Sequence, residues 1–451
     1  MILVQNYIGK PLLEDFMFRR KIENKLHEYY KNPDAEIVIV TGARQIGKSF
    51  IVRETAKTFF PHFIEINMQD DLDGDRLFAD VKTTKEFYWQ VSVLTQGAFG
   101  DANDTLIFMD EIQAYPRLLS LLKPLKRENR FRYIASGSLL GIALKHQFIP
   151  MGSMEEVKMY PMDFEEFLWA NGFTTPMIDE MKECYESRRA VPEVVHRTLL
   201  KKFKEYLVCG GLPRAVEEFL SNNIGQMRIL QSSIYGYYRD DASKYDEEHK
   251  LKIRTIYDFL PSYMENKVKR IQYAKLENKK NANLERYQDE FDYLVSSGIS
   301  LGVKAIANPV FPLVESASKN LIKLYYNDVG LLSNILYKNN VNAILNEDRG
   351  ANLGSVYETV CAMELAAHGH ELYYFDSKKA GEVDFLINDY ENQTVLPIEI
   401  KSGNDQNHFR AIPKLVKEPY SLKQGFVFGN ENTVSTKNNL TTFPVYMIMF
   451  I

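Results

Sequence analysis

The sequence predicts an α/β protein of several domains, and three observations support this prediction. The chain has 451 residues, so we expect roughly two to four domains. Apolar strand-like runs alternate with helical patterns over residues 1–163, as they do in proteins with a parallel sheet. After a mainly helical middle part, strand-like runs with embedded carboxylates appear within residues 336–451.

The composition is that of a soluble globular protein, with 45% apolar and 25% charged residues. No apolar run approaches the ~18–20 residues that a membrane-spanning helix needs, so we expect no membrane partner. The N-terminus lacks the pattern of a signal peptide. The cysteines, Cys184, Cys209 and Cys361, lie far apart and predict neither a zinc site nor disulfides. We therefore expect a cytoplasmic protein.

A phosphate-binding loop is the clearest motif. An apolar run from Ile37 to Val40 precedes a complete G-x-x-x-x-G-K-[ST] pattern, and helical spacing follows it. Such a loop turns its N–H groups toward an anion at a helix N-terminus. The spacing predicts that Lys48 binds the β- and γ-phosphates of ATP and that Ser49 binds Mg²⁺. The expected nucleotide-binding residues are Gly42, Ala43, Arg44, Gln45, Ile46, Gly47, Lys48, Ser49 and Phe50.

Two further strands end in polar residues that suit the same site. One apolar run ends in Asp110 and Glu111, which predicts that Asp110 completes the Mg²⁺ shell and that Glu111 polarises the attacking water. The other ends in Ser138, and two interpretations stay open. Its hydroxyl contacts the γ-phosphate or the attacking water, or it caps the following helix. We expect the remaining strands at His62–Met68 and Glu155–Met162.

Four motifs in this region are "TGARQIGKS", "LIFMDEIQ", "IASGSLLG" and "YPMDFEEFLWANG". Their order and spacing resemble those of a large bacterial and archaeal family of AAA-type ATPases that carry a C-terminal domain of unknown function. The similarity extends over nearly the whole chain. It implies binding and hydrolysis of ATP, with the Ser138 strand between the phosphate-loop and Asp-Glu strands. The segments "YLVCGGLPRAV" and "YYRDDASKY" resemble the helical lid of this family.

The chain departs from the family pattern at one place. Many relatives have Gly-Arg before the closing strand, where this chain has Gly152 and Ser153. If that arginine neutralises transition-state charge, another must replace it, and Arg127, Arg130 and Arg239 are candidates. Each has the alternative role of a plain surface or structural arginine. The departure favours a weak ATPase, or one that needs a partner.

The middle of the chain predicts a helical lid at 164–246, followed by three helices and a hairpin at 247–335 that resemble a winged helix. A turn at Gly210–Pro213 resembles an adenine-facing loop, although a helix connector explains it equally well. A basic run with Tyr273 inside it could neutralise nucleic-acid phosphates. A solvated face or an interdomain contact are the alternatives. The run consists of Lys267, Lys269, Arg270, Lys275, Lys279 and Lys280.

Four ionisable residues near the C-terminus form a second candidate site. Glu358 on a helix, Asp384 on a strand, and Glu399 and Lys401 on the next strand resemble the catalytic set of restriction-endonuclease-like nucleases. Residues two apart on a strand share a face, so Lys401 lies beside Glu399. Asp384 and Glu399 suit Mg²⁺, Glu358 would complete its shell, and Lys401 would activate a metal-bound water. The alternatives are a plain Glu399–Lys401 salt bridge, or a nuclease fold kept as an inactive scaffold.

The sequence thus predicts a P-loop NTPase domain at 1–163, a helical lid at 164–246, a winged-helix-like module at 247–335 and a restriction-endonuclease-like α/β domain at 336–451. The leading interpretation is a Mg-dependent ATPase whose nucleotide state controls the C-terminal domain. The alternatives are a metal-dependent nuclease regulated by ATP, and a non-catalytic nucleotide switch that recruits a protein partner.

Overall fold

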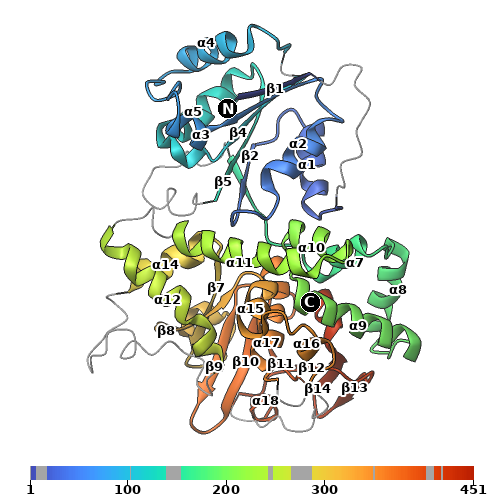
Figure 1. Ribbon diagram of the computed structural model, residues 1–451. Coiled ribbons are helices and arrows are strands. Elements are labelled where there is room, and N and C mark those ends of the chain that lie inside the picture. The colour runs from blue at the N-terminus through green and yellow to red at the C-terminus, as the bar shows by residue number, and fades with distance from the viewer. Residues whose placement is uncertain are drawn as a thin grey trace. The chain divides into compact units, whose positions relative to one another are not determined.

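The protein is described by a computed structural model that covers residues 2–6, 18–101, 103–138, 154–241, 247–265, 287–348, 351–402, 411–417 and 420–451 (Figure 1). The chain divides into two compact units. The first comprises Met1–Tyr160 and Ser296–Gly298, and the second comprises Pro161–Val295 and Ile299–Ile451. The finer division into four domains stays a prediction.

The first unit is built on a six-stranded sheet with the order β1-β3-β4-β5-β2-β6. The strand β1 runs antiparallel to β3, and the other pairs are parallel. The strand β5 lies between β2 and β4, which confirms the strand order that the family resemblance implies. The strands are β1 (Ile2–Asn6), β2 (Ile37–Thr41), β3 (His62–Asn67), β4 (Thr105–Asp110), β5 (Arg132–Gly137) and β6 (Met154–Lys158).

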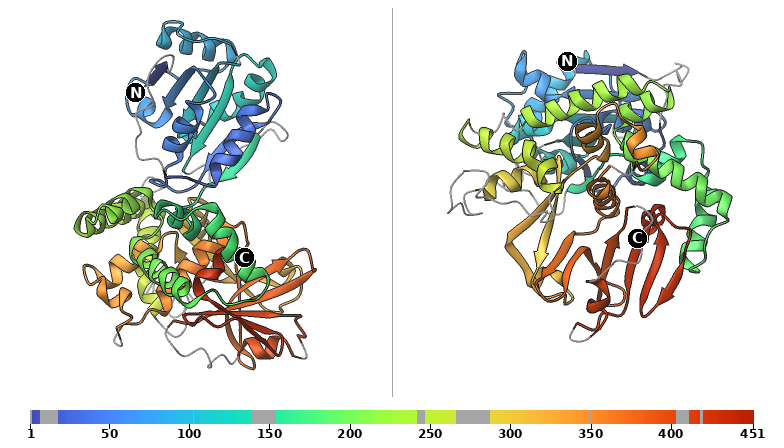
Figure 2. Two further views of the ribbon diagram at one scale, coloured as in Figure 1. Left: turned by 90° about the vertical axis from the view of Figure 1, so that its right-hand side faces the viewer. Right: turned by 60° about the horizontal axis from the view of Figure 1, so that its bottom comes forward.

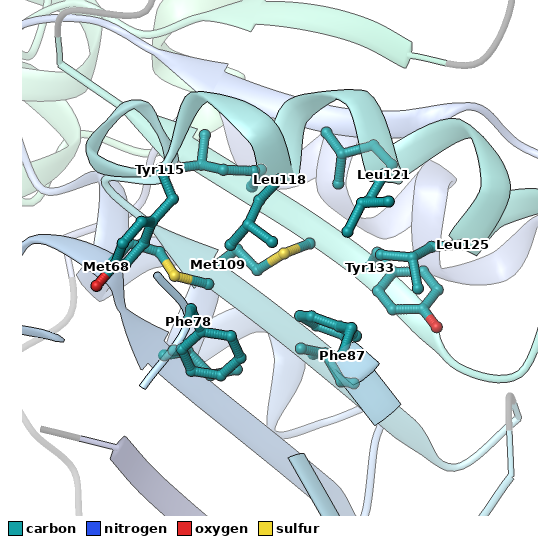
Figure 3. Packing of buried hydrophobic residues seen from close by; sticks show 14 of the residues in the cluster. Met68, Phe78, Phe87, Met109, Tyr115, Leu118, Leu121, Leu125 and Tyr133 are labelled. Carbon is teal, nitrogen blue, oxygen red and sulfur yellow. The ribbon is translucent and has the colours of Figure 1, made fainter. Parts of the chain in front are cut away.

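Helices cover both faces of this sheet, which is why β2, β4 and β5 are buried along their whole length (Figure 1). The helices α1 (Ile22–Lys31) and α2 (Lys48–Ala56) lie on one face, and α3 (Met68–Asp73), α4 (Thr84–Thr95) and α5 (Pro116–Glu128) lie on the other. Figure 3 shows the core on the second face, where α5 lays a row of leucines over Met109 and Tyr133 of the sheet. This packing fixes the strand ends that carry the polar motifs.

The second unit combines helices with an eight-stranded mixed sheet of order β13-β14-β12-β11-β10-β9-β7-β8 (Figure 2). Its strands are β7 (Ser300–Ile306), β8 (Ala317–Tyr326), β9 (Tyr373–Ser377), β10 (Gly381–Asp389), β11 (Thr394–Ile400), β12 (Gly425–Gly429), β13 (Ser435–Lys437) and β14 (Leu440–Pro444). Its helices are α7 (Phe164–Ala170), α8 (Thr175–Glu186), α9 (Glu193–Cys209), α10 (Pro213–Leu220), α11 (Ile224–Asp241), α12 (Glu247–Glu265), α14 (Gln288–Ser296), α15 (Val329–Tyr337), α16 (Asn342–Leu345), α17 (Gly354–Ala367) and α18 (Ile412–Leu415).

The β7–β8 hairpin belongs to this large sheet. The strand β7 pairs with β8 on one side and runs parallel to β9 on the other, with Ala305 opposite Tyr374. A winged helix would keep its hairpin within its own small module, so the winged-helix interpretation of 247–335 is not confirmed. The sequence did not indicate this place of the hairpin, because local patterns do not show which distant strand a segment pairs with.

A buried carboxylate explains the glycine pair between α9 and α10. Asp328 accepts hydrogen bonds from the backbone N–H of Gly211 (2.7 Å) and Leu331 (3.1 Å). Gly210 has a φ of 73°, and a Cβ there would lie 2.3 Å from Oδ1 of Asp328. Gly210–Pro213 therefore acts as a helix connector around Asp328, while the adenine-facing role stays a prediction.

Candidate functional site

The phosphate loop leaves β2 through a glycine that no other residue could replace. Gly42 has a φ of +137°, and a Cβ at this position would lie 2.2 Å from the carbonyl oxygen of Met159. Gly47 also has a positive φ, of 94°, at the point where α2 begins. The loop therefore packs closely against the chain that follows β6 and ends at a helix N-terminus, which is the geometry of an anion site.

Lys48 is buried inside this loop, at 5% exposure. Its Nζ donates hydrogen bonds to the carbonyl oxygens of Gly42 (3.0 Å) and Ala43 (2.8 Å). A buried ammonium needs such acceptors, because an uncompensated buried charge costs several kcal/mol. Phosphate oxygens are stronger acceptors, so this arrangement suits the predicted role of Lys48.

Ser49 and Asp110 form the predicted Mg²⁺ pair. Ser49 Oγ, in the first turn of α2, donates a 2.6 Å hydrogen bond to Oδ2 of Asp110, the last residue of β4. Ser136 Oγ donates to the other carboxylate oxygen. Burial raises the pKa of Asp110, and the hydrogen bonds from Ser136 and Ser49 oppose that rise. A hydroxyl and a carboxylate side by side are the hard oxygen ligands that Mg²⁺ prefers, so these residues fit the ion.

Glu111 is held by several donors next to this pair. Ser138 Oγ donates a 2.8 Å hydrogen bond to Oε2 of Glu111, and Gln113 Nε2 donates to the same oxygen. Burial raises the pKa of Glu111, but the charges of Lys48 and Arg44 and these hydrogen bonds outweigh it, so the pKa is lowered. Glu111 is therefore ionised at neutral pH, as a group that orients or deprotonates water must be.

Ser138 makes a contact that neither interpretation anticipated, because its hydroxyl donates to Oε2 of Glu111. The contact with the γ-phosphate or the attacking water stays a prediction. The helix-capping alternative involves residues 139–153, which lie outside the described residues, as do Gly152 and Ser153. The structure therefore adds a third role, in which Ser138 positions Glu111.

Sequence reasoning missed Arg20. This buried arginine donates to the carbonyl oxygens of Ile46 (3.0 Å) and Tyr160 (2.8 Å), and so fastens the phosphate loop to the end of the sheet. No motif marks it, since the contact joins segments 26 and 140 residues apart. Gln113, two residues beyond Glu111, was visible in the "DEIQ" motif but had no assigned role.

Two of the candidate charge-neutralising arginines make other contacts. The guanidinium of Arg130 lies 4.7 Å from the ring centre of Tyr88, which favours its structural role. Arg239, in the second unit, pairs with Asp240 at 3.4 Å. Arg127 lies in the last turn of α5, where a cation suits the helix dipole. The part that any of them plays in catalysis stays a prediction.

The C-terminal candidate residues lie on neighbouring elements, as expected. Asp384 on β10 accepts a 2.8 Å hydrogen bond from the backbone N–H of Ile400, and Lys401 Nζ donates a 2.7 Å bond to Oε1 of Glu399. Glu399 is 7% exposed, and its Oε2 is buried without a hydrogen-bond partner. Burial raises the pKa of Glu399, and the charge of Lys401 opposes that rise. The salt bridge predicted as an alternative is therefore present.

Additional polar residues join this cluster that the sequence did not indicate. Tyr325 Oη, on β8, donates a 3.0 Å hydrogen bond to Oε2 of Glu358 on α17. Lys323, also on β8 and 2% exposed, pairs with Glu382 on β10. Burial raises the pKa of Tyr325 well above its usual value, and the nearby Glu358 charge raises it further. Tyr325 and Lys323 join the cluster because the β7–β8 hairpin belongs to the same sheet, which local sequence patterns do not show.

The metal interpretation of this cluster rests on Asp384 and Glu399. Within the described ranges, no group of three or more His, Cys, Asp or Glu residues is arranged to hold a metal ion. The two carboxylates and the buried Oε2 of Glu399 suit a hard cation, so metal binding stays a prediction.

The basic run at 267–280 lies outside the residues that the structure describes.

Comparison with known families identifies the first site. Residues 34–168 match the family model of an AAA domain. This part of the chain resembles P-loop domains of the AAA type. Two other models match, both domains of unknown function: DUF8612 at residues 200–342 and DUF4143 at residues 353–448. The resemblance to AAA-type ATPases is therefore confirmed, whereas the restriction-endonuclease-like character of the C-terminal residues is not.

Solved structures resemble the chain only distantly. The Walker-type ATPase PABY2304 of Pyrococcus abyssi has 14% identity and a TM-score of 0.43, covering 76% of this chain and 100% of its own. A structure of Hsp104 with ATPγS and FITC-casein has 13% identity and a TM-score of 0.29, covering 49% of this chain and 40% of its own. No curated protein matches the chain. No helix in the described ranges is both long and apolar enough to cross a membrane.

Proposed function

We propose that the AAA domain binds Mg·ATP and hydrolyses its terminal phosphoanhydride bond. The observation that carries this proposal is the 2.6 Å hydrogen bond between Ser49 and Asp110, which joins the phosphate loop to the Asp-Glu strand. The AAA family match supports the same function. The two oxygens meet at the carboxyl end of the parallel sheet, where ligands of such sheets bind.

The residues of the domain divide the work. Lys48 exchanges its two loop carbonyl acceptors for phosphate oxygens, and Ser49 and Asp110 hold the metal. When bound, Mg²⁺ neutralises phosphate charge. Glu111, ionised and held by Ser138, orients the attacking water and accepts its proton. In this proposal the nucleotide state of the domain controls the activity of the second unit.

The experiment compares ATP turnover and nucleotide binding of the purified chain with those of Lys48→Ala. We expect the variant to lose both, because the buried cation of the loop is gone. Lys57→Ala is the matched control, since Lys57 caps the other end of α2 and pairs with Glu54. If Lys48→Ala binds and hydrolyses ATP as well as the parent, the proposal is wrong. Nucleotide binding without turnover by the parent would favour a non-catalytic switch.

A second candidate function is metal-dependent cleavage of nucleic acid by the C-terminal cluster. The buried, unpartnered Oε2 of Glu399 beside Lys401 and near Asp384 favours it, because burial of such an oxygen is costly unless a cation or proton occupies it. It predicts Mg²⁺- or Mn²⁺-dependent nicking of DNA or RNA that Asp384→Ala abolishes. Asp389→Ala, on the same strand but bonded only locally to Asn392, is the control. No nicking across a broad panel of substrates would refute it.

A further inference from the structure

The side chain of Arg44 extends from the phosphate loop to the ends of the neighbouring strands. Arg44 lies within the loop, and its Nε donates a hydrogen bond of 3.3 Å to Oγ of Ser138, just past β5. Ser138 in turn donates to Glu111, just past β4. The Arg44 charge is one of the causes that lower the pKa of Glu111. Arg44 Nε therefore lies on the side of the loop where Ser138 holds Glu111.

From this placement we infer that Arg44 recognises the terminal phosphate and lets the site distinguish a nucleoside triphosphate from a diphosphate. The inference rests on the proposed ATPase function. A phosphate loop encloses the inner phosphates, whereas residues at the neighbouring strand ends face the terminal one and the attacking water. The Arg44 side chain contacts Ser138, one of the strand-end residues. It would therefore bind the terminal phosphate, whereas the backbone of Arg44 belongs to the loop that encloses the inner phosphates.

The charges of the site favour a further cation beside the terminal phosphate. Asp110 is 6% exposed and Glu111 is next to it in sequence, so two carboxylates lie at the strand ends. A terminal phosphate placed beside them adds further negative charge in a poorly solvated place, where repulsion is strong. Lys48 serves the β- and γ-phosphates from within the loop. Arg44 adds a second cation, whose Nε lies against Ser138.

The chemistry of arginine fits this task better than that of lysine. A guanidinium presents five N–H donors in a rigid fork that matches phosphate oxygens, whereas an ammonium acts as a point charge. A diphosphate has no group at the terminal position and so leaves Arg44 on Ser138. Arg44 should therefore contribute to triphosphate affinity and turnover while contributing little to diphosphate affinity.

The test measures the affinities of Mg·ADP and of the non-hydrolysable triphosphate Mg·AMP-PNP by calorimetry on the full chain, together with ATP turnover. In Arg44→Ala we expect ADP affinity within about twofold of the parent and AMP-PNP affinity lower by about tenfold or more, the scale of one charge-assisted contact. Turnover should fall as well. Arg44→Lys should restore part of the triphosphate affinity. Arg117→Ala is the control, because Arg117 is an exposed arginine on α5 of the same domain and has no assigned role.

Equal loss of ADP and AMP-PNP affinity in Arg44→Ala would overturn the inference, because Arg44 would then support the structure of the loop and not recognise the terminal phosphate. Unchanged affinity for both would overturn it too. A parent chain that binds neither nucleotide would refute the proposed function itself, and that result is distinguishable because it appears without any substitution. Thermal melting monitored by circular dichroism shows whether Arg44→Ala is folded. If it is not folded, the affinities of Arg44→Lys for Mg·ADP and Mg·AMP-PNP test the inference in its place.

Discussion

Ser49 and Asp110 are 61 residues apart in sequence, yet Ser49 Oγ donates a 2.6 Å hydrogen bond to Oδ2 of Asp110. This hydrogen bond joins the first turn of α2 to the last residue of β4, at the edge of the sheet where the phosphate loop begins. Because the two oxygens already lie within hydrogen-bonding distance, a cation can bind both without a large rearrangement.

Removing the Ser49 hydroxyl should weaken metal binding more than nucleotide binding. In Ser49→Ala, we expect the Mg²⁺ concentration for half-maximal ATP turnover to rise roughly tenfold, the effect of losing about 1.4 kcal/mol of binding. Nucleotide affinity measured without Mg²⁺ should stay near that of the parent. Ser49→Thr keeps the hydroxyl and is the control. An unchanged Mg²⁺ requirement in Ser49→Ala would show that Ser49 is not a ligand.

Replacing Glu111 by glutamine should separate binding from hydrolysis. The side chain keeps its size, but it can no longer accept a proton from water, so turnover should fall by roughly 10²- to 10⁴-fold. Binding of Mg·ATP should persist, because Lys48, Ser49 and Asp110 are intact. Equilibrium binding and phosphate release measure the two properties. Glu128→Gln on α5, whose carboxylate bonds to Thr84, is the control.

The Glu399–Lys401 pair should reveal its structural contribution in a double-mutant cycle. Lys401→Met leaves the carboxylate of Glu399 buried without its cation, so unfolding free energy should fall by roughly 2–3 kcal/mol. Glu399→Gln in the Lys401→Met background should recover much of this loss, because no charge is then stranded. Urea unfolding measures all four chains. Additive effects of the two substitutions would mean that the pair does not interact energetically.

The buried Asp328 should make the second unit less stable as pH rises from about 4 to about 6. Burial raises the pKa of Asp328 from 3.8 to about 6, despite the backbone N–H groups of Gly211 and Leu331 that stabilise the charged form. Between these values the folded state binds more protons than the unfolded state, so its stability falls with rising pH. This contribution is present below pH 4 and is lost as pH passes 6, by on the order of 3 kcal/mol.

Asp328→Asn, which cannot ionise, should flatten this part of the stability profile. Urea unfolding at pH 4, 5, 6 and 7 measures the slope, which is the informative quantity because asparagine also loses one acceptor for a backbone N–H. Asp179→Asn, on the exposed side of α8, should keep the slope of the parent. If Asp328→Asn also keeps that slope, the carboxyl is not the titrating group.

The phosphate-loop motifs of the first unit could be located from the sequence because they are local in sequence. One continuous segment carries the loop from Gly42 to Ser49, and Asp110 and Glu111 are adjacent. Buried parallel strands are apolar throughout, so their ends are easily located, and the residues after them fall at one edge of the sheet. Strand order could not be derived this way and came from the family resemblance.

Contacts between distant segments escaped prediction. The Arg20 contacts to the loop, the pairing of Lys323 with Glu382 and the hydrogen bond from Tyr325 to Glu358 each join elements that no motif links. The antiparallel strand β1 was missed because its partner is set by the sheet edge and not by its own sequence. The hairpin was located correctly along the chain, but its place in the sheet depends on pairing with β9.

That pairing has a consequence for how the chain can be divided. The DUF4143 match covers residues 353–448, yet the β9 edge of its sheet is covered by β7, which lies at Ser300–Ile306 within the other family match. A fragment cut at residue 353 would expose an unpaired strand edge, which invites aggregation. The two segments match separate family models but contribute neighbouring strands to one sheet. A recombinant fragment or a chimera of the C-terminal part should therefore begin before residue 300.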